Sequence, residues 1–273
     1  MLGMPYCMRV KPLILILLVL VTFGVVQAQE TAAPKPIEPP SDGRYHSIHV
    51  PILMYHFVSD LPSESNASRR DLTVTPAIFH THLAYLSAQG YHTISLAQLD
   101  NALMTGASLP AKPIVLTFDD GYEDAYTNVL PALRAYGFTA TFFIITGMAD
   151  ANDPAYLSWA QIRAMSALGM DMEAHTVSHV DLRGRSREDQ VKQIAGSIES
   201  LQVHTGKAVH FFAYPGGAFD AETLAILKAN SIWLAVTTRD SAWETSSAPL
   251  ELPRLRIHHD MGAAGLAELL KAN

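Results

Sequence analysis

Cysteine is almost absent from this sequence: the single one, Cys7, lies close to the N-terminus. The rest of the chain therefore has no disulfide, no thiol nucleophile and no thiolate ligand to offer. Any metal that the chain binds must be held by histidine, aspartate or glutamate.

Positive charge is also scarce, because 19 lysines and arginines stand against 26 aspartates and glutamates, a net charge of -7. The basic residues form no stripe that could neutralise a phosphate backbone, so we expect no nucleic-acid partner.

The sequence lacks an apolar run long enough for a membrane span after the N-terminus. The N-terminal run from Leu13 to Val26 has about 14 residues, whereas a span needs roughly 20. It follows Arg9 and Lys11 and precedes Ala28, which predicts a secretory signal at residues 1–28. We therefore expect a periplasmic or extracellular protein with no stable membrane span after cleavage; an uncleaved signal anchor is the alternative.

Residues 29–47 contain four prolines and show no apolar periodicity, which is typical of an extended linker. We expect residues 48–273 to form one domain, because a chain of 273 residues with 49% apolar content can bury one large core.

Strand-like and helix-like segments alternate through this predicted domain. Such alternation indicates parallel strands with helices packed outside them, and in a barrel of this kind functional groups gather at the C-terminal ends of the strands. The predicted strands include HVPILMYHFV, PIVLTF, TATFFII, MDMEAH, VHFFAYP and IWLAVTT, and the predicted helices include 75–90, 123–136, 158–169, 186–206 and 220–230.

Polar residues follow three of these strands, where they do not help a core. Asp119 and Asp120 follow PIVLTF, His175 follows MDMEA, and the segment 215–217, Pro-Gly-Gly, follows HFFAY. Adjacent side chains point to opposite sides of a strand, so one aspartate can bind a metal while its neighbour acts as a base. A solvated turn is the alternative for this aspartate pair.

His175 and His179 lie four residues apart, so on a helical turn both imidazoles would share one face and could bind one ion. The chain has twelve histidines, and an isolated pair is usually incidental. Together with a carboxylate from another strand end, however, the pair provides two nitrogens and one oxygen and leaves a position for water. This combination favours a metal site.

Three stretches of this sequence, LTFDDGY, HTVSH and FAYPGG, resemble the motifs of the polysaccharide deacetylases with the NodB homology domain, also called carbohydrate esterase family 4. PILMYHFV, ATFFI and ELPR look like the branch of secreted deacetylases near the biofilm-polysaccharide enzymes. The resemblance runs from Val50 to the C-terminus. It implies a single distorted (β/α) barrel of the NodB type.

The resemblance also implies a metal-dependent N-deacetylase that releases acetate from a polysaccharide or oligosaccharide containing N-acetylglucosamine. A divalent metal, usually zinc, would be bound by Asp120, His175 and His179, and Asp119 would be the general base. The backbone N–H of Gly216 would then stabilise the oxyanion.

The sequence departs from the family pattern at the third motif. Ala213 stands where the family often has an arginine that pairs with the catalytic aspartate, and Gly216 stands where it commonly has a tyrosine. Arg254 in ELPR could supply the missing charge from another strand, and a surface ion pair is the alternative for this arginine.

The resemblance predicts a histidine as the acid that protonates the leaving amine. We favour His258 over His259 in LRIHH. His56, Tyr214 and Trp243 are further candidates for substrate contact, each with packing in the protein interior as the alternative.

The sequence offers two alternative functions. A glycosidase needs carboxylates about 5 to 9.5 Å apart on either side of the scissile bond, which neighbours on one strand do not easily provide. The other alternative is a barrel that binds carbohydrate but has lost catalytic activity.

Overall fold

The computed structural model describes residues 1–3 and 43–273. Most of the predicted signal segment and most of the predicted linker lie outside the described residues and stay predictions. The first strand, β1 (Ser47–His49), begins at the end of the predicted linker. Among the helices of the described ranges, none is both long enough and apolar enough to cross a bilayer.

The core of the domain is a parallel sheet. The segment before its last strand also bridges to the opposite edge, where Leu252 pairs with Val236, so the sheet curls into a distorted barrel. The predicted (β/α) barrel is confirmed. In order, the strands are β10 (Leu234–Val236), β9 (Phe211–Ala213), β8 (Asp171–Ala174), β7 (Thr141–Ile144), β6 (Pro113–Phe118), β2 (Ile52–Tyr55) and β12 (Leu255–Arg256), with β5 (His92–Thr93) paired to the start of β6.

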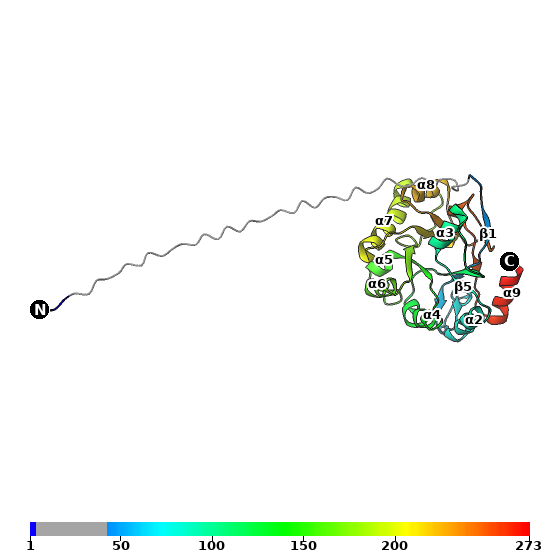
Figure 1. Ribbon diagram of the computed structural model, residues 1–273, viewed down its shortest axis with the longest axis horizontal. Coiled ribbons are helices and arrows are strands. Elements are labelled where there is room, and N and C mark those ends of the chain that lie inside the picture. The colour runs from blue at the N-terminus through cyan, green and yellow to red at the C-terminus, as the bar shows by residue number, and fades with distance from the viewer. Residues whose placement is uncertain (4–42) are drawn as a thin grey trace. The chain divides into compact units, whose positions relative to one another are not determined.

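Helices surround these strands, as Figure 1 shows for α2, α4, α6 and α8. Among the described helices, α3, α6 and α8 each start with a capping box. In each, a serine or aspartate side chain accepts a hydrogen bond from a free backbone N–H of the first turn. The helices are α1 (Ala67–Asp71), α2 (Pro76–Ala88), α3 (Leu96–Thr105), α4 (Leu130–Tyr136), α5 (Thr146–Asp150), α6 (Trp159–Ala167), α7 (Arg187–Thr205), α8 (Ala221–Ala229) and α9 (Ala263–Ala272).

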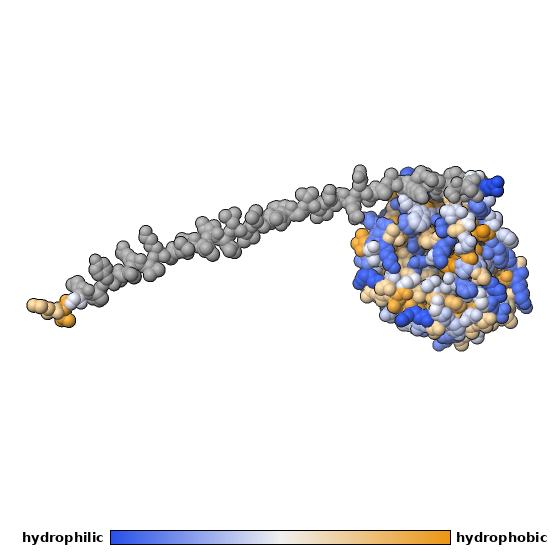
Figure 2. Space-filling model, in the orientation of Figure 1, coloured by the Kyte–Doolittle hydropathy of each residue, from blue (hydrophilic) through white to orange (hydrophobic). Residues whose placement is uncertain are grey.

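Two short sheets lie outside the barrel. One pairs β1 with β11 (Trp243–Thr245) in antiparallel fashion, and the other pairs β3 (Phe57–Val58) with β4 (Thr73–Val74) in parallel. The surface drawn in Figure 2 mixes hydrophilic and hydrophobic side chains.

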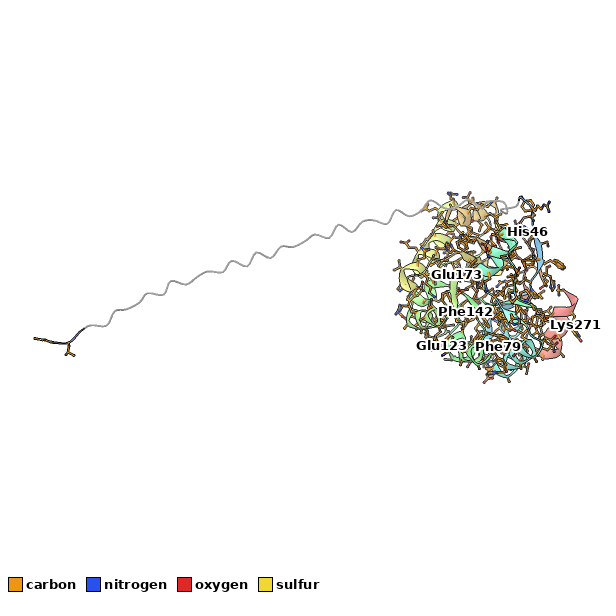
Figure 3. All side chains as sticks on the ribbon, viewed as in Figure 1. His46, Phe79, Glu123, Phe142, Glu173 and Lys271 are labelled. Atoms are coloured by element: carbon orange, nitrogen blue, oxygen red, sulfur yellow. The ribbon has the colours of Figure 1, made fainter. Side chains whose placement is uncertain are left out.

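Alternation along each strand divides the core into two clusters and decides which residues face the barrel interior. On β6, Ile114, Leu116 and Phe118 pack with the surrounding helices, whereas Val115 packs with the interior cluster that α3 covers. By the same alternation Asp119 faces inward. Figure 3 places Phe142 and Glu173 within the ring of helices, and both are buried.

One predicted helix differs from the structure. Residues 123–136 do not form one regular α-helix, because Ala125–Val129 is a π-helical turn that leads into α4. Pro131 has no N–H to donate to the carbonyl four residues earlier, so the regular hydrogen-bond pattern cannot pass through it.

Candidate metal and catalytic site

The functional side chains come from the C-terminal ends of neighbouring strands. Asp119 and Asp120 follow β6, His175 follows β8, and His56 follows β2. Because β2, β6, β7 and β8 are parallel and adjacent in the sheet, these ends meet at one rim of the barrel.

The segment that carries the two histidines is a turn and not the predicted helical turn. Thr176 has a φ of 66° and His179 a φ of 52°, so the backbone takes the left-handed conformation twice. The Thr176 hydroxyl accepts a hydrogen bond from the His179 backbone N–H at 2.9 Å, which supports the turn. The prediction of a shared helical face was wrong, although the turn still brings both rings together, with their centroids 5.0 Å apart.

Asp120, His175 and His179 converge on one point. Asp120 Oδ1 lies 3.3 Å from His175 Nε2 and 3.2 Å from His179 Nε2, and the three ligand atoms all lie within 4.8 Å of one another. Asp120 and His175 are buried, whereas the His179 side chain is 43% exposed. The group is therefore reachable from solvent on the His179 side.

Hydrogen bonding sets the tautomer of His175. Its Nδ1 lies 2.7 Å from the carbonyl oxygen of Ala213, which can only accept, so Nδ1 carries the proton. In the neutral ring, Nε2 then presents a lone pair toward Asp120 Oδ1, which is buried and has no hydrogen-bond partner among the described residues. A metal ion bound between these two atoms would satisfy both, and a donor set of two imidazole nitrogens and one carboxylate oxygen fits zinc.

The charges of this cluster are strongly coupled. Burial lowers the pKa of His175, but the carboxylates of Asp120 and Asp119 outweigh burial and raise it. Burial raises the pKa of the Asp120 carboxyl, but His175, His56 and His179 outweigh burial and hold the pKa below its ordinary value. Burial lowers the pKa of His179, and neighbouring His175 lowers it further, which favours the neutral ring that a metal requires.

Asp119 is held by Arg254 through two parallel hydrogen bonds. Both guanidinium terminal nitrogens lie 2.7 Å from its two carboxylate oxygens, and Arg254 is fully buried. Burial raises the pKa of Asp119, but the adjacent guanidinium outweighs this effect and lowers the pKa. Arg254 therefore supplies the charge that Ala213 lacks. It is not the surface ion pair considered above, nor is it accessible to a substrate, because its other donors bind Thr237 and Thr117.

The structure places His56, and not His258, beside Asp119. His56 Nε2 lies 4.0 Å from Asp119 Oδ2, and burial lowers the pKa of its ring. The His258 ring is paired instead with Asp71 Oδ1 at 2.9 Å and is largely exposed. His259 Nδ1 lies 2.7 Å from the backbone oxygen of Thr73.

The side chains of two predicted substrate contacts do not face the rim. Tyr214 is fully buried, donates its hydroxyl proton to Leu250 O at 2.7 Å and stacks on Phe219. Its strand position turns the ring toward the surrounding helices, so it has no face for a sugar. Trp243 pairs with His49, which precedes β2, whereas the site follows the other end of β2.

Gly216 does lie next to the rim, in the turn that follows β9. It has a φ of 60°, and a Cβ atom added there would meet nothing within 4 Å. The backbone can therefore approach a ligand closely at this position, and its predicted oxyanion role stays a prediction.

Asp71 is a residue whose role the sequence did not predict. It binds Arg256 of β12 and His258, which follows that strand. Its carboxylate contacts Arg256 at 2.7 Å and His258 at 2.9 Å. An aspartate at the end of a short helix with no motif around it carries no sequence signal of this role.

Comparison with known proteins identifies the family. The polysaccharide deacetylase family model matches residues 106–233. A solved deacetylase from Streptococcus pyogenes, PplD in complex with acetate, is 30% identical, with a TM-score of 0.77 over 82% of this chain and 99% of that chain. The chain belongs to the polysaccharide deacetylase family.

Other polysaccharide deacetylase relatives extend over most of the domain. YxkH of Bacillus subtilis is 27% identical over 223 residues, 82% of this chain and 76% of that protein. The poly-beta-1,6-N-acetyl-D-glucosamine N-deacetylase of Staphylococcus epidermidis is 25% identical over 228 residues, 79% of this chain and 78% of that protein. The resemblance seen in the sequence is thus confirmed. The chain described here is a polysaccharide deacetylase, a class of hydrolase.

Proposed function

We propose that this polysaccharide deacetylase is an exported, metal-dependent N-deacetylase that releases acetate from glycans containing N-acetylglucosamine. The name of the Staphylococcus epidermidis relative supports this substrate class, since it acts on a poly-N-acetylglucosamine. Zinc is the proposed metal, with Asp120, His175 and His179 as its ligands.

The convergence of one carboxylate oxygen and two imidazole nitrogens beside Asp119 carries this proposal. A divalent ion bound there supplies Lewis acidity toward water and toward the amide carbonyl. Asp119, held ionised by Arg254, accepts the proton of the attacking water.

The remaining steps use residues of the same rim. The backbone N–H of Gly216 is our candidate donor to the oxyanion. Two histidines are candidates for the acid that protonates the leaving amine. One is His258, which the sequence predicted, and the other is His56, which lies next to Asp119. Burial lowers the pKa of His56 and favours its neutral ring, so the acid role requires that the ring first receive a proton. Asp119 is the neighbouring group that can pass one on. Replacing each histidine separately by glutamine distinguishes them, since only loss of the acid abolishes turnover with metal retained.

The central test measures acetate release from a panel of biofilm glycan, peptidoglycan and chitin-like chains, with and without a chelator. We expect the chelator to abolish release and added zinc to restore it. An activity indifferent to chelation would refute the metal dependence.

Asp119→Asn is the matched catalytic control because it keeps the size of the side chain and removes the base. We expect this variant to lose acetate release by several orders of magnitude while its zinc content stays at that of the parent. A barrel that only binds carbohydrate would show no turnover in either protein.

A further inference from the structure

A column of stacked side chains stands beside the candidate metal ligands. The Arg69 guanidinium carbon lies 3.3 Å from the centroid of the Phe57 ring, and Phe57 stacks on Tyr122 at 3.5 Å. Tyr122 in turn contacts Tyr156, with centroids 5.0 Å apart and the rings tilted by 33°. The column thus ends in Tyr156, which comes from the loop between α5 and α6.

Backbone hydrogen bonds fix the last member of the column. Tyr122 and Tyr156 form an antiparallel bridge, Glu123 N–H donates to Ala155 O at 3.0 Å, and Leu157 N–H donates to Gly121 O at 2.8 Å. The loop that carries Tyr156 is therefore tied directly to the segment that follows Asp120. Its position relative to the site does not depend on flexible side chains.

The chain itself places this pair of rings next to the candidate metal ligands. Tyr122 lies two residues after Asp120, and the bridge and the two backbone hydrogen bonds hold Tyr156 against the same segment. The rings therefore stand beside the segment of the rim that carries Asp120.

The two ends of this column differ. Arg69 covers the far face of Phe57, and its guanidinium is itself bound to Thr73 and Ser59. Across the described residues, the Tyr156 ring contacts no aromatic ring other than Tyr122, and Tyr156 is partly exposed. Gly216, in the turn after β9, has no side chain, and no atom lies within 4 Å of the place that a Cβ atom would take there.

We propose that Tyr156 is the aromatic platform for the sugar ring whose acetamide is hydrolysed. A pyranose has an apolar C–H face that packs on an aromatic ring, and its hydroxyl groups can bond to a phenolic hydroxyl at the edge of that ring. A sugar stacked on Tyr156 would continue the column at the part of the rim that carries Asp120. This inference rests on the proposed function, and it makes Tyr156 a determinant of binding and not of the chemical step.

The test compares Tyr156→Ala with Tyr156→Phe and Tyr156→Trp in the metal-loaded protein. We expect Tyr156→Ala to raise KM by about tenfold with kcat and zinc content little changed, because stacking contributes mainly to binding. Phe and Trp keep an aromatic face and should hold KM within about threefold.

Tyr136→Ala is the matched control, since Tyr136 is a partly buried tyrosine on α4 that stacks on Phe138 at 6.0 Å. It should lower stability without changing KM. If Tyr156→Ala does not fold, Tyr156→Leu keeps much of the volume without the aromatic face and should show the same rise in KM. An equal KM in Tyr156→Ala or Tyr156→Leu and the parent overturns the proposal.

A binding measurement separates this inference from the proposed function. Calorimetry with an N-acetylglucosamine oligosaccharide in the Asp119→Asn background reports binding without turnover. Affinity that falls when Tyr156→Ala is added supports the platform even if no tested glycan releases acetate. Unchanged affinity refutes the platform even if the parent enzyme is active.

Discussion

At the scale of single residues, Arg254 is the side chain on which the base depends. It is fully buried with both terminal nitrogens on Asp119, so its removal would leave a buried carboxylate unpaired. We predict that Arg254→Met lowers the free energy of unfolding by about 3–5 kcal/mol. The pKa of Asp119 should rise because burial is no longer opposed, so the acid limb of the acetate-release profile should move to higher pH.

Arg256→Met is the control for Arg254→Met. Arg256 lies two residues along the same segment and contacts Asp71 at 2.7 Å, but both side chains are partly exposed. Its loss should cost less than about 1 kcal/mol in urea unfolding and leave the pH profile in place. Equal effects from the two variants would contradict the role given to Arg254.

At the scale of elements, the turn at 175–179 brings the His175 and His179 rings together, a task that the sequence analysis assigned to a helical turn. Thr176 is buried and left-handed, an unfavourable conformation for a β-branched residue, and its hydroxyl holds the His179 backbone. We predict that Thr176→Val, which replaces the hydroxyl by a methyl group of similar size, weakens zinc affinity by roughly tenfold, because His179 is no longer oriented. Titration calorimetry measures this affinity.

Thr176→Asn is the companion variant for the turn. Asparagine tolerates the left-handed conformation and can still accept the hydrogen bond, so zinc affinity should stay near that of the parent, and the free energy of unfolding should rise by about 1 kcal/mol. Equal zinc affinity in the Val variant and the parent would show that the hydroxyl does not position His179.

At the scale of the whole molecule, a buried acid ties stability to pH. Glu244 of β11 is fully buried, neither carboxyl oxygen has a hydrogen-bond partner within the described part of the chain, and burial raises its pKa to about 9. Because the folded pKa lies above the unfolded one, its contribution is fully present below the unfolded pKa and is lost as pH rises toward 9. The expected slope is about 1.4 kcal/mol per pH unit in this window.

We predict that Glu244→Gln removes this slope from the pH dependence of the free energy of unfolding, measured in urea between pH 5 and 9. The variant should become more stable than the parent toward the alkaline end of the range. Glu188→Gln, which changes an exposed glutamate on α7, should leave the slope unchanged. A parent and a Glu244→Gln variant with parallel profiles would contradict the prediction.

The sequence by itself determined the barrel and the segments that meet at its rim. Alternating strand and helix patterns require a parallel sheet, and a parallel sheet brings the ends of its strands to one edge. For that reason the proximity of Asp120 to His175 could be expected before any distance was known. His179 follows because four residues of chain cannot carry it far from His175.

Only the tertiary structure decided which distant side chains complete the rim. Arg254 lies 135 residues from Asp119, and Tyr156 reaches Tyr122 through a loop with no motif. The Tyr214 ring turns away from the rim because of strand alternation, and Trp243 lies beside the other end of β2. Local patterns encode strands and helices, but contacts between them depend on the packing of the whole chain.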